Sequence, residues 1–184
     1  LRSDGEVVGV LGLDLRRGEL IAFVGAATIL ASGGHMGSYR VTTIPQAFGD
    51  GCAMAYKAGA AIMDMEFADF YTYTAIWPPI TEGDIWPSVL KYDLHAKLLN
   101  SEGEDFMKRY TGADRIPPLA VLREVRAGRG SAHGGAYLSV RHHPKEVLEK
   151  FFASLGRPHW LKRLKEIDFD FTKEDVEVAP AGIV

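Results

Sequence analysis

The residues best suited to chemistry form a Gly-Asp-Gly turn, Gly49-Asp50-Gly51, directly before a predicted helix rich in alanine and glycine. Glycine permits a tight turn and a close approach of the backbone to a ligand. At a helix entrance, the Asp50 carboxylate can accept hydrogen bonds from free backbone N–H groups or from a sugar hydroxyl. These properties suit a backbone pressed against a large planar cofactor. The alternative is structural, with Asp50 only an N-cap and the alanines only a packing face.

The histidines and the cysteine are the remaining candidates for metal chemistry. His133 falls in a glycine-rich loop over residues 129–135, and His142-His143 follow a predicted strand. Their spacing fits no common zinc pattern, and no cysteine or acidic partner stands nearby. His143 is instead expected in the capping region before a helix. Cys52 is the one cysteine, which excludes an internal disulfide framework and a cysteine-rich cluster, so we expect no metal site.

The composition bounds the class of protein. The chain has 184 residues, 47% of them hydrophobic and 24% charged, as is ordinary for a soluble globular protein. This length accommodates one domain, or one domain and a piece of another. The net charge of -3 and the lack of a basic stripe with interleaved aromatic residues argue against a nucleic-acid partner. No apolar run approaches the roughly 20 residues that span a bilayer, so no direct membrane insertion is expected.

The strands and helices that must position these residues can be predicted from the spacing of apolar residues and from the prolines and glycines that interrupt regular structure. Alternating and apolar runs predict strands over residues 7–15, 20–24, 26–31, 64–73, 136–140 and 175–179. The first two form a hairpin, and the third is a buried strand that ends in Ser32-Gly33-Gly34. Helices are predicted over residues 49–63 and 117–127, with two more beginning at Pro144 and Pro158. The Trp-Pro sequences within residues 74–90 predict an irregular segment.

Read in order, several short motifs resemble one protein family. They are Gly49-Asp50-Gly51, Ala58-Gly59-Ala60, Asp64-Met65-Glu66-Phe67, Leu98-Leu99-Asn100, Gly103-Glu104-Asp105-Phe106-Met107 and Glu124-Val125-Arg126-Ala127-Gly128-Arg129-Gly130. Each motif is weak alone, but their joint order and spacing are specific. The chain, from about residue 7 to residue 180, resembles the flavoprotein subunit of succinate dehydrogenase and fumarate reductase, a family that includes L-aspartate oxidase.

The resemblance implies an α+β fold made of two pieces. Residues 1–69 would be the last part of a Rossmann-like FAD-binding domain, and residues 70–184 a capping domain that closes over the flavin. No G-x-G-x-x-G fingerprint opens the chain. The chain begins without Met and stops just after a predicted strand, so we expect a fragment of a longer flavoprotein.

The resemblance also implies site residues. Ser32, Gly33 and Gly34 fall on the flavin-side glycine pair, with Ser where Thr is usual, and Gly49, Asp50 and Gly51 on the FAD-contacting turn. Tyr71 stands where the family has a substrate-binding histidine. A phenol carries no positive charge at neutral pH, which puts the usual C4-dicarboxylate in doubt. The alternative for Tyr71 is a half-buried strand aromatic.

Three more residues follow from the resemblance. Thr81 and Glu82 resemble a substrate-side Thr-Glu pair, although the spacing from Tyr71 is about two residues short, and Glu82 is alternatively an exposed loop carboxylate. Arg115 aligns with the catalytic arginine of the family if the alignment allows a deletion of one residue between Arg115 and Glu124. Proton delivery by a guanidinium needs a desolvated pocket with adjacent carboxylates. The alternative is a surface arginine in an ion pair.

Two functions remain open from the sequence. In the first, the parent protein is an FAD-dependent oxidoreductase that moves a hydride between flavin N5 and a carbon of a small carboxylate-like substrate. Electrons would leave to a separate iron–sulfur partner subunit, and the protein would be cytoplasmic or held at a membrane through its partners. In the second, the chain is a non-catalytic cap-like module or truncated product with a binding or structural role.

Overall fold

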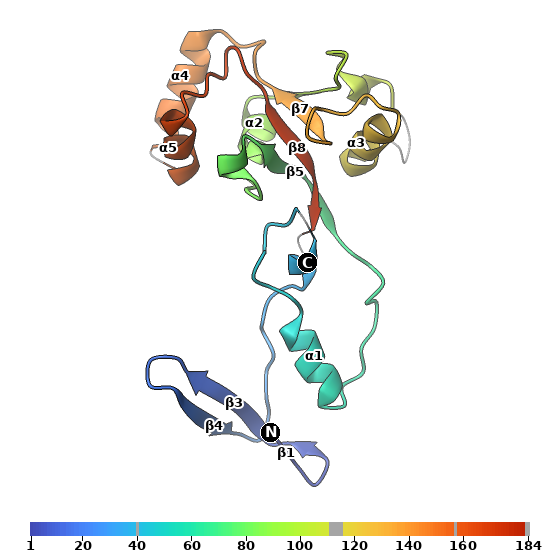
Figure 1. The fold of residues 1–184 in the computed structure, drawn as a ribbon, viewed down its shortest axis with the longest axis vertical. Coiled ribbons are helices and arrows are strands. Elements are labelled where there is room, and N and C mark those ends of the chain that lie inside the picture. The colour runs from blue at the N-terminus through green and yellow to red at the C-terminus, as the bar shows by residue number, and fades with distance from the viewer. Residues whose placement is uncertain (40, 111–115, 157, 183–184) are drawn as a thin grey trace.

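The structure, a computed structural model, describes residues 1–39, 41–110, 116–156 and 158–182. Its elements divide into an extended part, residues 1–69, and a compact part, residues 70–182 (Figure 1). We call these the N-terminal segment and the C-terminal body. They differ in how their side chains are buried, and the assignment of one to an FAD-binding domain and of the other to a capping domain stays a prediction.

The N-terminal segment consists of two hairpins, a 3-10 turn and one helix. Their bounds are β1 (Arg2–Ser3), β2 (Glu6–Val7), β3 (Gly9–Asp14), β4 (Glu19–Val24), η1 (Met36–Ser38) and α1 (Asp50–Lys57). β1 pairs with β2, and β3 with β4, both antiparallel. Oδ1 of Asp14 accepts hydrogen bonds from the N–H groups of Arg16 and Arg17 at 2.9 and 3.2 Å, which fixes the β3–β4 turn. The predicted hairpin is therefore confirmed.

Three predictions for this segment are wrong in part or in whole. Residues 26–31 form no strand and are all exposed, since no described strand lies beside them to complete a ladder. Helix α1 ends at Lys57 instead of residue 63, because Gly59 adopts a φ of +93°, which terminates a helix. The strand expected over residues 64–73 begins only at Phe70 and runs on to Trp77.

The C-terminal body is built on a four-stranded sheet with helices around it. Its elements are β5 (Phe70–Trp77), η2 (Pro79–Thr81), α2 (Pro87–Asp93), β6 (Lys97–Leu99), η3 (Phe106–Lys108), α3 (Pro117–Arg126), β7 (Ala136–Ser139), α4 (Lys145–Ser154), α5 (His159–Glu166) and β8 (Val176–Gly182). The strands lie in the order β5-β8-β7-β6, each antiparallel to its neighbour. Helices α2 and α3 pack against the sheet, and α4 and α5 lie together at one side of the body (Figure 1).

The hydrophobic core lies entirely within the C-terminal body. It joins sheet residues such as Leu98, Leu138 and Val178 to side chains from α2, α3, α4 and α5. The rings of Trp86 and Trp160 stack with centroids 4.5 Å apart and so connect the start of α2 to α5. This packing gives the body a fixed frame for the loops at its edges.

Most of the elements predicted here are confirmed. Helices α3, α4 and α5 and strand β7 lie where periodicity and proline placed them. The irregular segment expected over residues 74–90 is wrong, because β5 continues to Trp77 and Pro87 opens α2, where a proline is tolerated in the first turn. Every strand pair in the described residues is antiparallel, in keeping with the mixed α+β class. None of the helices formed by the described residues of the chain combines the length and the apolar character that a membrane span requires.

Candidate functional site

The six residues predicted to contact a cofactor line one cavity. Ser32, Gly33 and Gly34 and the turn Gly49-Asp50-Gly51, which are separated along the chain, meet around a space of about 380 Å³. The rest of the lining comes from the loop before the turn, with Ile44, Gln46, Ala47 and Phe48. The structure therefore brings the two predicted segments together in one place.

Glycines make this approach sterically feasible. A Cβ on Gly51 would lie 1.8 Å from Oγ of Ser32, so the two segments touch where only a hydrogen is present. Gly49 has a φ of +88°, which L-residues with side chains rarely adopt, and a Cβ there would lie 3.1 Å from Cβ of His35. These glycines thus let the two segments pack closely, which brings both of them to the wall of the cavity.

Asp50 is the charged group of this cavity. The N-cap of α1 is Gly49, Asp50 is the first helical residue, and no side chain makes a capping hydrogen bond. The interpretation of Asp50 as an N-cap is therefore wrong. Its exposed carboxylate has no hydrogen-bond or ion-pair partner within the described residues. A free carboxylate at a helix start accepts hydrogen bonds well from hydroxyl groups and repels phosphate, so it suits the sugar-like part of a ligand.

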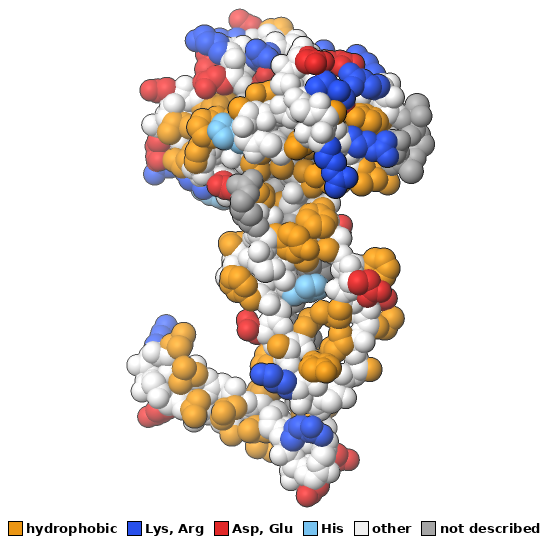
Figure 2. Space-filling model, turned by 45° about the vertical axis from the view of Figure 1, so that its right-hand side comes forward, with side chains coloured by type: hydrophobic (Ala, Val, Ile, Leu, Met, Phe, Trp, Pro, Cys, Tyr) orange, Lys and Arg blue, Asp and Glu red, His pale blue; other side chains and the backbone are white. Residues whose placement is uncertain are grey.

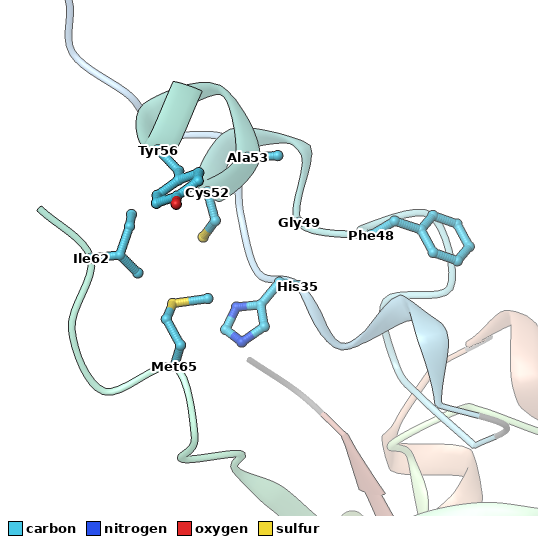
Figure 3. A pocket seen from close by; sticks show the side chains of 8 residues that line it. All are labelled: His35, Phe48, Gly49, Cys52, Ala53, Tyr56, Ile62 and Met65. Carbon is cyan, nitrogen blue, oxygen red and sulfur yellow. The ribbon is translucent and has the colours of Figure 1, made fainter. Parts of the chain in front are cut away.

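A second cavity, of about 410 Å³, shares Phe48 and Gly49 with the first. Figure 3 shows its side chains, with the Cys52 sulfur and the Met65 thioether turned toward the ring of His35. Tyr56 and Ile62 also line it, and the lining is mainly apolar. Sequence reasoning missed these residues, although Cys52 and Tyr56 occupy one helix face four residues apart, next to the turn that it singled out.

Tyr71 lies on β5 and is half-buried against the core. Its ring meets that of Tyr73 edge-on at 6.0 Å. Burial, together with the neighbouring Tyr92 of α2, raises the pKa of the Tyr71 phenol, although a hydrogen bond with Ser88 works in the opposite direction. Burial also raises the pKa of Tyr73 to about 12. Tyr71 therefore stays neutral at ordinary pH and lies in the setting of a strand aromatic, and its substrate role remains a prediction.

Thr81 and Glu82 sit at the edge of the body, but they face different ways. The Thr81 side chain is buried in η2, and its hydroxyl donates to the Pro78 carbonyl at 2.9 Å. In this arrangement that hydrogen is not directed at a ligand. Glu82 is exposed. The next residue, Gly83, lies so close to the N-terminal segment that a Cβ on it would be 3.0 Å from the Thr42 carbonyl oxygen.

Arg115 lies outside the described residues, as does the neighbouring Asp114. Near them in the chain is a buried carboxylate, Glu124 on α3, which sequence reasoning used only as an alignment point. Nε and Nη2 of Arg129 donate to Glu124 at 2.8 and 3.0 Å, the Tyr110 hydroxyl at 2.7 Å and Nδ2 of Asn100 at 3.1 Å. Chiefly because of the hydrogen bonds from Arg129, the pKa of Glu124 falls to about 2 despite its burial.

The histidines require one correction. An acidic partner does stand beside His133, because Nδ1 of His133 lies 2.8 Å from Oε1 of the buried Glu177, 44 residues along the chain. Trp77 stacks on the same imidazole at 4.2 Å. His143 precedes α4 as expected, but its Nε2 lies 2.7 Å from the Leu94 carbonyl oxygen, away from the helix start. Among the described residues, no three His, Cys, Asp or Glu side chains group as metal ligands would.

Comparison with known proteins identifies the relatives of this chain. A family model described as "FAD binding domain" matches residues 1–157. The chain is 37% identical over 188 residues to a subunit of the CoM/CoB fumarate reductase of Methanothermobacter marburgensis, covering 99% of this chain and 33% of the relative. It is 34% identical over 190 residues to the mitochondrial succinate dehydrogenase (ubiquinone) flavoprotein of Oryza sativa subsp. japonica, covering 97% of this chain and 28% of that relative.

A solved structure agrees with this similarity. Mycobacterium smegmatis Sdh1 in complex with UQ1 is 31% identical and superimposes with a TM-score of 0.72, over 97% of this chain and 30% of that one. The chain thus spans about a third of the length of the curated relatives that it matches.

Proposed function

The chain belongs to the FAD binding domain family, and from this premise we propose that it forms part of an FAD-dependent oxidoreductase of the succinate dehydrogenase and fumarate reductase type. FAD is the cofactor of this family, as the sequence predicted. Because the chain spans only about a third of its relatives, the reaction, the substrate and the partners of the whole protein are part of the proposal.

One observation carries the proposal. Two short glycine-containing segments, separated in the chain by residues 35–48, touch at Gly51 and Ser32 and line one cavity with the free carboxylate of Asp50. Beside it lies the mainly apolar cavity around Cys52 and Met65. A cavity with a free carboxylate next to a mainly apolar one suits FAD, which joins a flat ring system to a polyhydroxyl chain.

The two parts of the molecule would have different tasks. In our proposal, residues 1–69 contribute to the FAD-binding domain, and residues 70–184 form a capping domain. Two contacts join them in support of this division: the rings of Tyr39 and Phe70 meet edge-on at 5.2 Å, and Gly83 lies against Thr42. A substrate bound between flavin and cap would then be enclosed by the edge of the sheet at Phe70 and by the loop with Glu82.

The proposed reaction is hydride transfer between flavin N5 and a carbon of a small carboxylate-like substrate. FAD, when bound, supplies the redox chemistry. The chain would bind FAD through residues 32–34 and 49–51 and orient substrate through Tyr71 and Glu82, with Thr81 holding the loop in place through its hydrogen bond to Pro78. Arg115 would deliver the proton. With a single cysteine in the chain, we assign onward electron transfer to a separate iron–sulfur subunit.

FAD binding tests the proposal directly. Protein purified with FAD should be yellow, and titration should quench flavin fluorescence. Asp50→Asn keeps the shape of the side chain but removes the acceptor charge, and we expect affinity for FAD to fall by about tenfold, as for loss of one charge-assisted hydrogen bond. Asp64→Asn, outside the lining of either cavity, is the matched control and should leave affinity unchanged. Equal affinities for both variants would remove Asp50 from the site.

The alternative, a non-catalytic cap-like module, makes the opposite prediction. Its support is the C-terminal body, which has a complete core of its own. Protein that stays colourless after FAD addition, with an intact C-terminal body by circular dichroism, would favour this alternative.

A further inference from the structure

We propose that Arg163 is a positioning residue that clamps the loop over residues 78–84 against the N-terminal segment. This inference rests on the proposed function, since that loop carries the predicted substrate residues Thr81 and Glu82. Arg163 lies on α5, about eighty positions along the chain from the loop, and no motif of the sequence pointed to it.

One side of the loop is tied to β5 by main-chain hydrogen bonds. The Ala75 N–H donates to the Asp84 carbonyl at 2.8 Å, and the Gly83 N–H donates to the Ala75 carbonyl at 2.9 Å. Within the loop, the Thr81 hydroxyl and N–H both donate to the Pro78 carbonyl at 2.9 Å. These bonds tie the loop to β5, and its support from the helix side comes from α5.

Arg163 supplies that support with two different contacts. Its Nη1 donates to the Ile80 carbonyl oxygen at 2.7 Å, and its Nη2 forms an ion pair with the Asp84 carboxylate. The guanidinium therefore grips the loop on both sides of Thr81 and Glu82. Its Nε is buried and has no acceptor in the described part of the chain. Burying an unpaired donor is unfavourable, so the two contacts at the loop set the position of the side chain.

The helix that carries Arg163 is itself firmly held. Trp160, Leu161 and Leu164 are buried in the core, and Trp160 stacks on Trp86, which follows the loop in the chain. On its far side the loop meets the N-terminal segment, where Gly83 lies against the Thr42 carbonyl. Arg163 thus connects the core of the body to the loop where the body meets the N-terminal segment.

Amide hydrogen exchange tests the clamp without any ligand. Arg163→Lys keeps the charge but cannot span two acceptors with a planar fork. We expect the amides of residues 81–84 to exchange about tenfold faster in this variant, because opening of the loop becomes easier. Arg141→Lys is the matched control, since Arg141 pairs with Asp175 elsewhere in the same body, at 2.7 Å. Unchanged exchange of residues 81–84 in Arg163→Lys would overturn the proposal.

A second measurement asks whether the clamped loop serves a carboxylate ligand. The flavin absorbance of the FAD-loaded protein is titrated with malonate, and we expect the dissociation constant to rise about tenfold in Arg163→Lys and Asp84→Asn with FAD content unchanged. Arg141→Lys should stay near the parent value. If malonate leaves the parent flavin spectrum unchanged while the loop amides still exchange faster in Arg163→Lys, the substrate class proposed above is wrong and the clamp stands. If malonate binds all variants equally, the loop does not position substrate.

Discussion

The N-terminal segment and the C-terminal body both contain regular elements, yet the hydrophobic core cluster lies in the body, whereas most apolar side chains of the N-terminal segment are exposed, although Met36 is buried. Leu20 and Val24 on β4 are 68% and 80% exposed, whereas Leu90 and Leu138 of the body are 0% and 1% exposed. In Figure 2, hydrophobic side chains lie on the surface over much of the lower, extended part. Local pattern is therefore sufficient to shape a hairpin, but not to give it a core.

This contrast has a thermodynamic consequence. A two-stranded hairpin alone is marginally stable at best, because it buries too little apolar surface to offset chain entropy. The N-terminal segment therefore gains little stability from its own contacts, whereas a buried core stabilises the body. We expect substitutions in the two regions to have very different effects, and the predictions below test that difference.

The largest expected effect is a core truncation in the body. Leu138→Ala, at the centre of the sheet, should lower the free energy of unfolding by about 3 kcal/mol, since it removes buried surface and leaves a cavity. Leu11→Ala makes the same chemical change at a side chain that is 55% exposed, and should cost less than about 0.5 kcal/mol. Urea unfolding of the two variants provides the measurement. Similar losses in both would show that the N-terminal segment has a core after all.

The next effect concerns the buried carboxylate of the body. The pKa of Glu124 is lowered from 4.5 to about 2, so its ionised form stabilises the fold above pH 4.5, and that contribution is lost as pH falls from about 4.5 to about 2. Glu124→Gln should therefore lose about 3 kcal/mol at neutral pH and should lose less than the parent on acidification through this range. Urea midpoints across pH give the test. The exposed Glu146→Gln on α4 is the control, and acid sensitivity in Glu124→Gln as large as in the parent would place its origin elsewhere.

Sequence reasoning was most successful where local rules decide the outcome. Helices α3, α4 and α5 follow from apolar spacing with proline at the start, and α3 and α4 also have glycine just past the end. It failed where a neighbour decides, as at residues 26–31, whose apolar run has no described strand to pair with. Pro87 was interpreted as a breaker, although the following apolar residues pack into the core as α2.

The residues of the candidate site also differ in whether the sequence could predict them. The segments with Ser32 and Asp50 could be predicted because glycine spacing and family resemblance both mark them, and the structure brings them together. The cavity residues Cys52 and Met65 and the contacts of Arg163 could not, since they depend on how distant segments fold back. The pairing of His133 with Glu177, which spans 44 residues, was missed for the same reason.

A smaller effect separates ligand binding from stability in the N-terminal segment. Gly51→Ala would force a Cβ against Ser32 Oγ, 1.8 Å away, and so push apart the two segments that line the cavity. We expect affinity for FAD to fall about tenfold, near 1.4 kcal/mol. The stability of the body should not change. Gly25→Ala, whose Cβ would come no closer than 3.4 Å to another group, is the control and should leave FAD affinity unaltered. Loss of affinity in both variants would point to general disruption of the segment.

The smallest effect on stability is expected on the exposed hairpin face itself. Leu13 and Leu20 face each other across β3 and β4 and are 56% and 68% exposed. Replacing both with serine should change the free energy of unfolding by less than about 0.5 kcal/mol, because little buried surface is lost. The same change should reduce self-association of the chain, measured by light scattering, since exposed apolar faces drive unspecific contacts. A large loss of stability would mean that these leucines already pack against the rest of the molecule, and the contrast between the two regions would then fail.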